Sequence, residues 1–213
     1  MADAARSHFD RRFEFAATVL LAVAAVATAW ASYQSARWHG EQARAQSASI
    51  AARVESTRAA NLANRQTEID VALFTQWVDA YANDETELAA FYRRRFRVEF
   101  RPAFEAWVAT RPRKNPDAPL SPFALPQYKL SATSTADRLE AKAAAASLRA
   151  GNFIQRADNN ALVVVLFAAA LFFAGISTRL RSRTTRLVIL GLGYAMFLGS
   201  VIWIATFPIS LSL

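Results

Sequence analysis

The chain has 213 residues, of which 54% are hydrophobic and 20% are charged, and its formal net charge is +8. It contains no cysteine, which excludes disulfides, cysteine-ligated zinc, iron–sulfur clusters and thiol nucleophiles. With only two histidines, a histidine-based metal site or catalytic triad is hard to build within one chain. The chain is strongly apolar, and yet a fifth of its residues are charged. This combination indicates that apolar and charged residues occupy separate blocks of the sequence.

Three stretches without a charged residue are long enough to cross a bilayer. A helix rises 1.5 Å per residue, so about 20 residues cross a hydrocarbon core roughly 30 Å thick. We therefore predict transmembrane helices at 15–36, 159–178 and 187–207, the last followed by a short tail at 208–213. The alternative interpretation is that these stretches are buried core helices of a soluble protein. Three such stretches in one chain argue against it.

The distribution of arginine predicts the orientation of these spans. The flank at 1–14 and the loop at 179–186 are the short basic segments, and the loop holds no acidic residue. Cytoplasmic flanks carry the excess of Lys and Arg. We therefore expect both segments in the cytoplasm and residues 37–158 outside it, in the periplasm of a bacterium whose inner membrane holds the protein. The topology-determining residues are Arg11, Arg12, Arg179, Arg181, Arg183 and Arg186.

A cleaved signal peptide is the competing interpretation of the first span. The triplets 27–29 and 29–31 both have the small-residue pattern of a cleavage site. The apolar run is long for a signal peptide, however, and it continues into helix-forming sequence without a break. We therefore favour an uncleaved span.

Residues 34–81 contain no proline and a single glycine, and they are rich in Ala, Arg, Gln and Glu, which favour helix. The larger apolar residues recur at helical spacing. They are Ile50, Val54, Leu62, Ile69, Leu73 and Trp77. The pattern predicts that the first span continues as one long helix to about Ala82.

A small helical head is predicted next. Asp84 followed by Glu87 is a helix-capping pattern and predicts a helix over 85–100, which Pro102 breaks or restarts as a short helix over 103–110. Five prolines make 111–126 an irregular loop. Its apolar residues, and Tyr128 just after it, indicate that it lies against the helices (Leu120, Phe123, Leu125 and Tyr128).

A second capping pattern, Ser134 with Asp137, predicts a return helix that leads straight into the second span. The predicted fold is thus an all-α integral membrane protein with three transmembrane helices. A long helical-hairpin stalk and a small helical head lie between the first and second spans. Seven aromatic residues of the head form either its core or a docking surface, and core is the commoner use (Trp77, Tyr81, Phe91, Phe96, Phe104, Trp107 and Phe123).

Known catalytic patterns are missing from the sequence, and it predicts no catalytic, cofactor-binding or metal-binding residue. We expect a protein that is not an enzyme. The basic run Arg93, Arg94, Arg95 and Arg97 suits an anionic ligand or an acidic partner, because guanidinium groups form paired hydrogen bonds. A solvated helix face balanced by nearby acidic residues is the simpler interpretation. Nucleic acid is not an expected partner of a domain outside the cytoplasm.

Two faces of the spans favour helix association. Gly191, Ala195 and Gly199 follow each other at four-residue spacing, which lets helix backbones approach closely. A small and hydroxyl-rich face of the first span is either a packing seam or the lining of an oligomeric pore, and packing is commoner. This face comprises Thr18, Ala25, Thr28, Ser32 and Ser35. No charged residue lies inside a span, which argues against a proton- or ion-coupled transporter.

Aromatic and proline residues occur in an unusual arrangement in the segments Gln76-Trp77, 88–92 (LAAFY), 95–97 (RFR), 100–107 (FRPAFEAW), 115–119 (NPDAP), 121–123 (SPF) and 172–179 (FFAGISTR). Through these segments, residues from about 74 to 206 resemble uncharacterised bacterial membrane proteins with three transmembrane helices and a helical extramembrane insert. The resemblance implies the architecture and gives no activity and no site.

The expected function is therefore that of a lipid-embedded oligomer, or of an accessory or scaffold subunit in a membrane complex. Its helical domain outside the cytoplasm would contact other proteins. The alternative is an oligomeric ion channel lined by the hydroxyl face of the first span.

Overall fold

The computed structural model of the chain describes residues 2–207, with side chains from residue 11 onward. Within that range every regular element is helical. In chain order the elements are α1 (Ala2–Ala82), α2 (Thr86–Arg95), α3 (Arg101–Ala109), the 3₁₀ helix η1 (Pro122–Ala124), α4 (Ser131–Ser177) and α5 (Arg183–Ala205). Three of them, α1, α4 and α5, are long and apolar enough to cross a membrane. The all-α prediction and the three helices of spanning length are confirmed.

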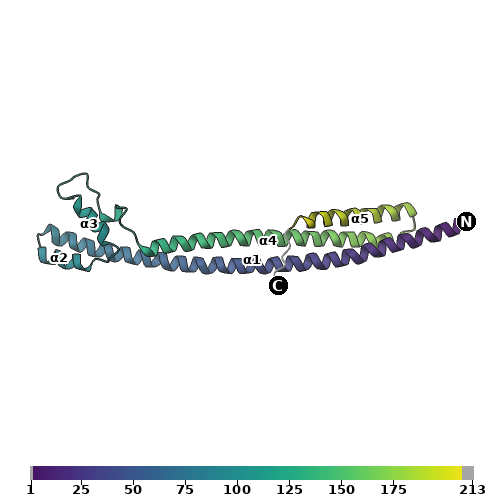
Figure 1. Cartoon of the computed structure of the whole chain (residues 1–213), viewed down its shortest axis with the longest axis horizontal. Coiled ribbons are helices and arrows are strands. Elements are labelled where there is room, and N and C mark those ends of the chain that lie inside the picture. Colours follow the sequence, from purple (N-terminus) through teal and green to yellow (C-terminus); the bar gives the residue numbers. More distant parts are fainter. Residues whose placement is uncertain (1, 208–213) are drawn as a thin grey trace. The chain divides into compact units, whose positions relative to one another are not determined.

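The described residues form two compact units. Unit 1 combines residues up to 47 with those from 146 onward, and unit 2 comprises residues 48–145. The predicted long first helix is confirmed to its last residue, because α1 ends at Ala82. Figure 1 shows α4 running alongside α1, and α5 alongside α4 in unit 1.

In unit 1, small side chains line the contact between α1 and α4. Ala17, Ala24 and Ala31 are fully buried at seven-residue spacing, which keeps one face of a helix toward its neighbour. Ala157 of α4 is also fully buried, and its carbonyl accepts a hydrogen bond of 3.0 Å from the Ser35 hydroxyl. Side chains this small allow two helix backbones to approach closely.

Helix α5 packs on α4 and α1 within unit 1. A Cβ built on Gly193 would lie 3.3 Å from the Ala170 carbonyl oxygen and 3.4 Å from Cβ of Phe173, so only glycine fits at this contact without adjustment. The Tyr194 hydroxyl donates to the Ala16 carbonyl at 2.9 Å. Gly193 therefore lies on the face of α5 that packs against the other helices of the chain.

In unit 2, the same kind of contact joins the other parts of α1 and α4. The Ser49 hydroxyl donates to the Ala143 carbonyl and the Ser56 hydroxyl to the Ala136 carbonyl, both at 2.9 Å. A step of seven residues along α1 is matched by seven residues backward along α4. The two helices are therefore antiparallel, with their registers fixed by buried serines.

The head of unit 2 has an aromatic core. Helices α2 and α3 and the proline-rich loop cover the end of α1, and the residues with little or no exposure are Trp77, Phe96, Phe100, Phe104 and Trp107. Most neighbouring rings meet edge to face, with centroids 4.7 Å apart for Phe96 and Phe104 and 4.8 Å apart for Trp77 and Phe104. This geometry suits the charge distribution of aromatic rings. For most of the aromatic residues the core interpretation is confirmed, whereas Tyr81 and Phe91 are exposed.

Several predicted boundaries in the head were wrong. Helix α2 ends at Arg95 and not near residue 100, because Phe96 adopts ψ 136° and the chain then turns so that both Phe96 and Phe100 enter the core. Asp84 is not the cap of α2, since Glu85 precedes the helix and Asp84 has a positive φ of 58°. The predicted short helix over 103–110 is confirmed as α3, which begins two residues earlier, at Arg101, and ends one residue earlier, at Ala109.

The return helix also begins earlier than predicted. Helix α4 starts at Ser131, and Ser134 lies one turn inside it. The backbone N–H of Ser131 donates to Oε1 of Glu99 at 3.0 Å, so a carboxylate from a distant segment caps this helix. In the proline-rich loop, Phe123 packs against the head core as predicted, but Leu120 is 99% exposed.

Candidate functional site

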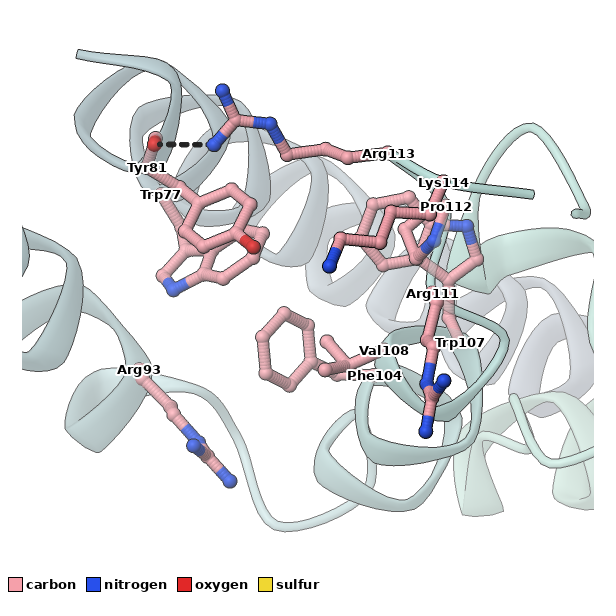
Figure 2. A pocket seen from close by; sticks show the side chains of 10 residues that line it. All are labelled: Trp77, Tyr81, Arg93, Phe104, Trp107, Val108, Arg111, Pro112, Arg113 and Lys114. Carbon is pink, nitrogen blue, oxygen red and sulfur yellow. Dashed lines mark hydrogen bonds between the residues drawn. The ribbon is translucent and has the colours of Figure 1, made fainter. Parts of the chain in front are cut away.

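A cavity of about 720 Å³ opens in the head of unit 2. Its walls come from the end of α1, the end of α2, helix α3 and the first residues of the proline-rich loop. Figure 2 shows the ten side chains that line it: Trp77, Tyr81, Arg93, Phe104, Trp107, Val108, Arg111, Pro112, Arg113 and Lys114. The size lies within the range of pockets that hold small organic ligands.

The apolar part of this cavity is rigidly packed. Trp77 stacks on Tyr81 with centroids 4.8 Å apart and meets the ring of Phe104 edge-on at the same distance. The indole N–H of Trp107 donates to the Pro119 carbonyl at 2.7 Å, which ties α3 to the loop. Trp77, Phe104 and Trp107 also belong to the buried head core, so these three rings form an aromatic floor that the fold itself holds in place, whereas Tyr81 beside them is exposed.

Cations surround the aromatic floor. Arg93, Arg111, Arg113 and Lys114 all contribute to the lining, and none of the ten described residues that line the cavity is acidic. The nearest recorded carboxylate contacts are long: Glu105 lies 4.0 Å from Arg93 and Asp84 lies 3.9 Å from Arg113. Exposed ion pairs of this kind contribute little energy. The positive charge at the cavity is therefore only weakly compensated.

Arg111 has an unusual backbone conformation beside this cavity. Its φ is 53°, the left-handed region that glycine adopts readily, and it directly follows Thr110, which caps α3. Glycine is the usual residue where a helix ends in this way. Here an arginine occupies the position, and its side chain lines the cavity.

The structure places the four arginines of the predicted basic patch in three different environments. Arg93 lines the cavity, whereas the guanidinium of Arg95 lies 3.3 Å from the ring centroid of Phe91. Arg94 stays close to Arg93, since both line a smaller cavity together with Arg101. Arg97 turns inward to a buried carboxylate. The patch is therefore not one surface.

Three cations of the cavity were missed in the sequence. Arg111, Arg113 and Lys114 lie in the proline-rich segment, for which the sequence predicts only an irregular loop. Their proximity in sequence to Trp107, at the end of a short helix, was the available signal. Their convergence with Arg93 and Tyr81 depends on the fold and has no sequence signature.

A buried ionic cluster lies elsewhere in the head. Asp70 of α1 is fully buried, and its Oδ2 accepts hydrogen bonds from Arg97 Nη1 at 2.9 Å and from the Tyr128 hydroxyl at 3.1 Å. Arg97 also pairs with Glu99, which caps α4. This cluster joins α1, the turn after α2 and the start of α4 through side chains.

The environment shifts three pKa values within the cluster. Burial raises the pKa of Asp70 above its ordinary 3.8, although the charge of Arg97 opposes the shift. Burial likewise raises the pKa of the Tyr128 hydroxyl above 10.0. The hydrogen bond from Ser131 lowers the pKa of Glu99 below 4.5. Oδ1 of Asp70 has no hydrogen-bond partner among the described residues. The shifts at Asp70 and Tyr128 thus follow from burial, and the shift at Glu99 follows from its capping of α4.

Metal binding finds no support in the described side chains. Within residues 11–207, no group of three or more His, Asp or Glu side chains lies close enough to hold a metal ion.

The predicted packing strip of α5 faces away from its own chain. Gly191, Ala195 and Gly199 are exposed in unit 1, and a Cβ added at Gly191 or Gly199 would meet nothing within 4 Å. Gly193, two residues away from Gly191, makes the close contact with α4 instead. The two sets of glycines thus lie on different faces of one helix.

The hydroxyl face of α1 is divided in the same way. Thr18, Ala25 and Ser32 are exposed and Thr28 is half-buried, whereas Ser35 is buried against α4. The hydroxyls of Thr18, Thr28 and Ser32 donate to carbonyls one turn earlier in α1, at 2.7–2.8 Å. Most of this face is therefore not covered by α4 or α5.

Of the arginines predicted to set topology, two lie inside α1, two lie between α4 and α5, and two lie in the first turn of α5. Arg11, Arg12, Arg179, Arg181 and Arg183 are exposed. The guanidinium of Arg186 instead lies 4.2 Å from the ring centroid of Phe13. This contact connects the beginning of α5 with α1.

Comparisons of the chain with protein-family models, with curated proteins and with solved structures found no match.

Proposed function

We propose that this protein is a non-enzymatic subunit of a membrane complex, formed with copies of itself or with other membrane proteins. Residues 15–36, 159–178 and 187–207 are its transmembrane segments. Both short basic segments lie in the cytoplasm, and the helical domain at 37–158 lies in the periplasm of a bacterium. Three helices long and apolar enough to cross a bilayer support this assignment.

The observation that carries the proposal is the pair of glycine faces on α5. Gly193 packs against α4, whereas Gly191 and Gly199 have open space where a side chain would begin. Small residues at four-residue spacing let another transmembrane helix approach the backbone closely. The exposed face is thus suited to a helix that the chain itself does not supply.

The two faces allow a matched experiment. Leucine at Gly191 and Gly199 should leave the fold of unit 1 intact, because no atom lies near either Cβ, but should separate associated subunits. Leucine at Gly193 should instead disturb the packing on α4. Native mass spectrometry of protein extracted in mild detergent measures the subunit number, and helical circular dichroism during heating measures the fold.

The result expected is fewer subunits for Gly191→Leu/Gly199→Leu with unchanged melting, and a lower melting temperature for Gly193→Leu. An unchanged complex in the double variant would contradict the proposed use of this face. A wild-type chain that is monomeric in lipid, with no partner retained, would contradict the proposal as a whole.

The alternative function is an oligomeric pore. It is favoured by the exposed position of Thr18, Ala25 and Ser32 on α1, since a pore needs a polar face that the chain's own helices leave uncovered. Cryo-electron microscopy in lipid nanodiscs separates the two functions. A symmetric ring with this face around a central axis supports the pore, and any assembly in which lipid or protein covers the face contradicts it.

The proposed orientation has an independent test. A phosphatase that is active only in the periplasm, inserted near Pro119, should be active. Activity of a cytoplasmic reporter at the same position would reverse the orientation.

A further inference from the structure

We propose that the cavity in the head binds an organic anion in which a phosphate or carboxylate group is attached to an apolar or aromatic body. This goes beyond the function proposed above, because the binding needs neither a partner nor a particular subunit number. All ten lining residues lie in unit 2, so the site is complete within one folded unit.

The charge of the lining selects for an anion. Arg93, Arg111, Arg113 and Lys114 supply four cationic side chains, and no carboxylate is among the described lining residues. Glu105 and Asp84 stand at 4.0 and 3.9 Å from their arginines, and the side chains in these pairs are mostly exposed. A ligand anion can therefore take the guanidinium hydrogen bonds without breaking a strong ion pair.

The apolar lining of the cavity selects for an apolar body. Trp77, Phe104 and Trp107 are at most 8% exposed and are held in the head core, whereas Tyr81 is 44% and Val108 41% exposed, and both line the same cavity (Figure 2). A bare anion would leave the apolar surface of Tyr81 and Val108 in water. A ligand that also covers these two side chains gains the free energy of removing that surface from water.

Two arginines are held beside the rings. The guanidinium of Arg93 lies 5.8 Å from the ring centroid of Phe104, and that of Arg113 lies 5.0 Å from the centroid of Tyr81. Arg113 also donates to the Tyr81 carbonyl at 3.4 Å. Cationic and aromatic groups therefore stand next to each other on opposite sides of the floor, which matches a ligand with both parts.

The backbone of Arg111 is a second, independent indication. A non-glycine residue in the left-handed region is strained, and such strain is concentrated at binding sites. The φ of Arg111 is 53°, at a helix end where glycine is the favoured residue. An arginine therefore does not stabilise the backbone conformation at this position. Its side chain, in contrast, adds a charge to the cavity.

The test is isothermal titration calorimetry on the full chain in nanodiscs of zwitterionic lipid. The probes are 1-naphthyl phosphate, inorganic phosphate and 1-naphthol. We expect naphthyl phosphate to bind with higher affinity than either of its parts. No binding of naphthyl phosphate to the wild-type chain, or equal affinity for inorganic phosphate alone, would overturn the proposal.

Variants with reversed charge test whether naphthyl phosphate binds in this cavity. Arg93→Glu and Arg113→Glu should each weaken the affinity by about tenfold or more, since each removes a charge-assisted contact and adds a repulsive one. The matched control is Arg95→Glu, which lies in the same helix as Arg93 but packs over Phe91 outside the cavity. An equal loss in the control would show nonspecific attraction to the head and would overturn the site.

A second variant covers the case in which a charge reversal prevents folding. Val108 is 41% exposed and lines the cavity without belonging to the buried core. Val108→Glu places a carboxylate inside the cavity and leaves all four cations and the rings in place. It should abolish binding of naphthyl phosphate, and unchanged affinity would overturn the proposal.

The same assay distinguishes two sources of the ligand. Dihexanoyl phosphatidic acid, used below its micelle concentration, carries the phosphate on acyl chains, and naphthyl phosphate carries it on a ring. Higher affinity for the first assigns a lipid, and higher affinity for the second assigns a soluble aromatic anion. Because the calorimetry reports on unit 2, its result is independent of the subunit number measured with the α5 variants.

Discussion

The guanidinium of Arg97 donates to the fully buried carboxylate of Asp70 at 2.9 Å, and these two residues belong to different segments of the head. Arg97 lies in the turn after α2, and Asp70 lies in α1 four residues before Phe74, which packs against the aromatic core. A buried charge is tolerated only when it is paired. The pair therefore requires the turn after α2 to dock at one position on α1.

Removing only one partner should be costly. Arg97→Met leaves the carboxylate of Asp70 buried and without its cation, and we expect a loss of roughly 3–5 kcal/mol in the free energy of unfolding of the head. Replacing both residues, Asp70→Leu with Arg97→Met, should restore most of that loss because no unpaired charge remains. Urea unfolding in detergent, followed by near-ultraviolet circular dichroism of the aromatic core, measures both. A single variant as stable as the wild type would show that the pair does not fix the turn.

Asp70 and Glu99 should give the head opposite responses to pH. The pKa of Asp70 is raised in the folded state, so its contribution to stability is fully present below 3.8 and is lost as the pH rises through the raised value. The pKa of Glu99 is lowered, so its contribution is present above 4.5 and is lost as the pH falls through the lowered value.

Two neutral variants separate these responses. Asp70→Asn should remove the part of the stability that declines toward neutral pH, and Glu99→Gln should remove the part that declines in acid. The urea midpoint, measured between about pH 3 and pH 7 for each variant, gives the two slopes. If Glu99→Gln loses stability in acid as steeply as the wild type does, then Glu99 is not the acid-sensitive cap of α4.

The sequence predicts the extent of the long helices more accurately than it predicts the helix boundaries in the head. The end of α1 at Ala82 follows from composition and periodicity, since no proline interrupts residues 34–81. The end of α2 at Arg95 does not, because no glycine or proline marks it and the turn accompanies the burial of Phe96 and Phe100. Tertiary packing overrides local preference there.

The candidate cavity could not be predicted from the sequence, for a related reason. Arg93 was identified as part of a basic run, but the run itself is divided among three environments by the fold. Residues that line the cavity come from positions 77 to 114, and no fixed spacing connects Tyr81 with Arg113. Asp70 was missed because an acidic residue in a polar helix looks like solvated surface until its partners are known.

Arg111→Gly should stabilise the head and weaken ligand binding at the same time. Glycine relieves the cost of the left-handed backbone, which is about 1–2 kcal/mol for a residue with a side chain. The variant should therefore unfold at higher urea concentration while its affinity for naphthyl phosphate falls. Asp84→Gly is the matched control, since Asp84 also has a positive φ but does not line the cavity. Its stability should rise by less, because Asp tolerates this conformation better, and its affinity should stay unchanged.

The buried serines should limit side-chain size between α1 and α4 in unit 2. Ser49→Ala removes the hydrogen bond to the Ala143 carbonyl and should cost about 0.5–1.5 kcal/mol. Ser49→Leu forces a larger side chain between closely packed helices and should cost about 1–3 kcal/mol. Ala51→Leu, at an exposed position on the same helix, should have little effect. Equal stability of the two leucine variants in urea would show that the contact does not require a small residue.

Trp107→Phe should loosen the proline-rich loop without unfolding the head. The variant keeps an aromatic ring in the core but loses the indole N–H that donates to the Pro119 carbonyl at 2.7 Å. A neutral hydrogen bond contributes about 1 kcal/mol, so local opening of the loop should become about fivefold more frequent. Limited trypsin digestion measures this as faster cleavage after Lys114. Cleavage after Lys142, which lies within α4, should keep its wild-type rate. Equal acceleration at both lysines would mean that Trp107 stabilises the unit as a whole and does not act specifically on the loop.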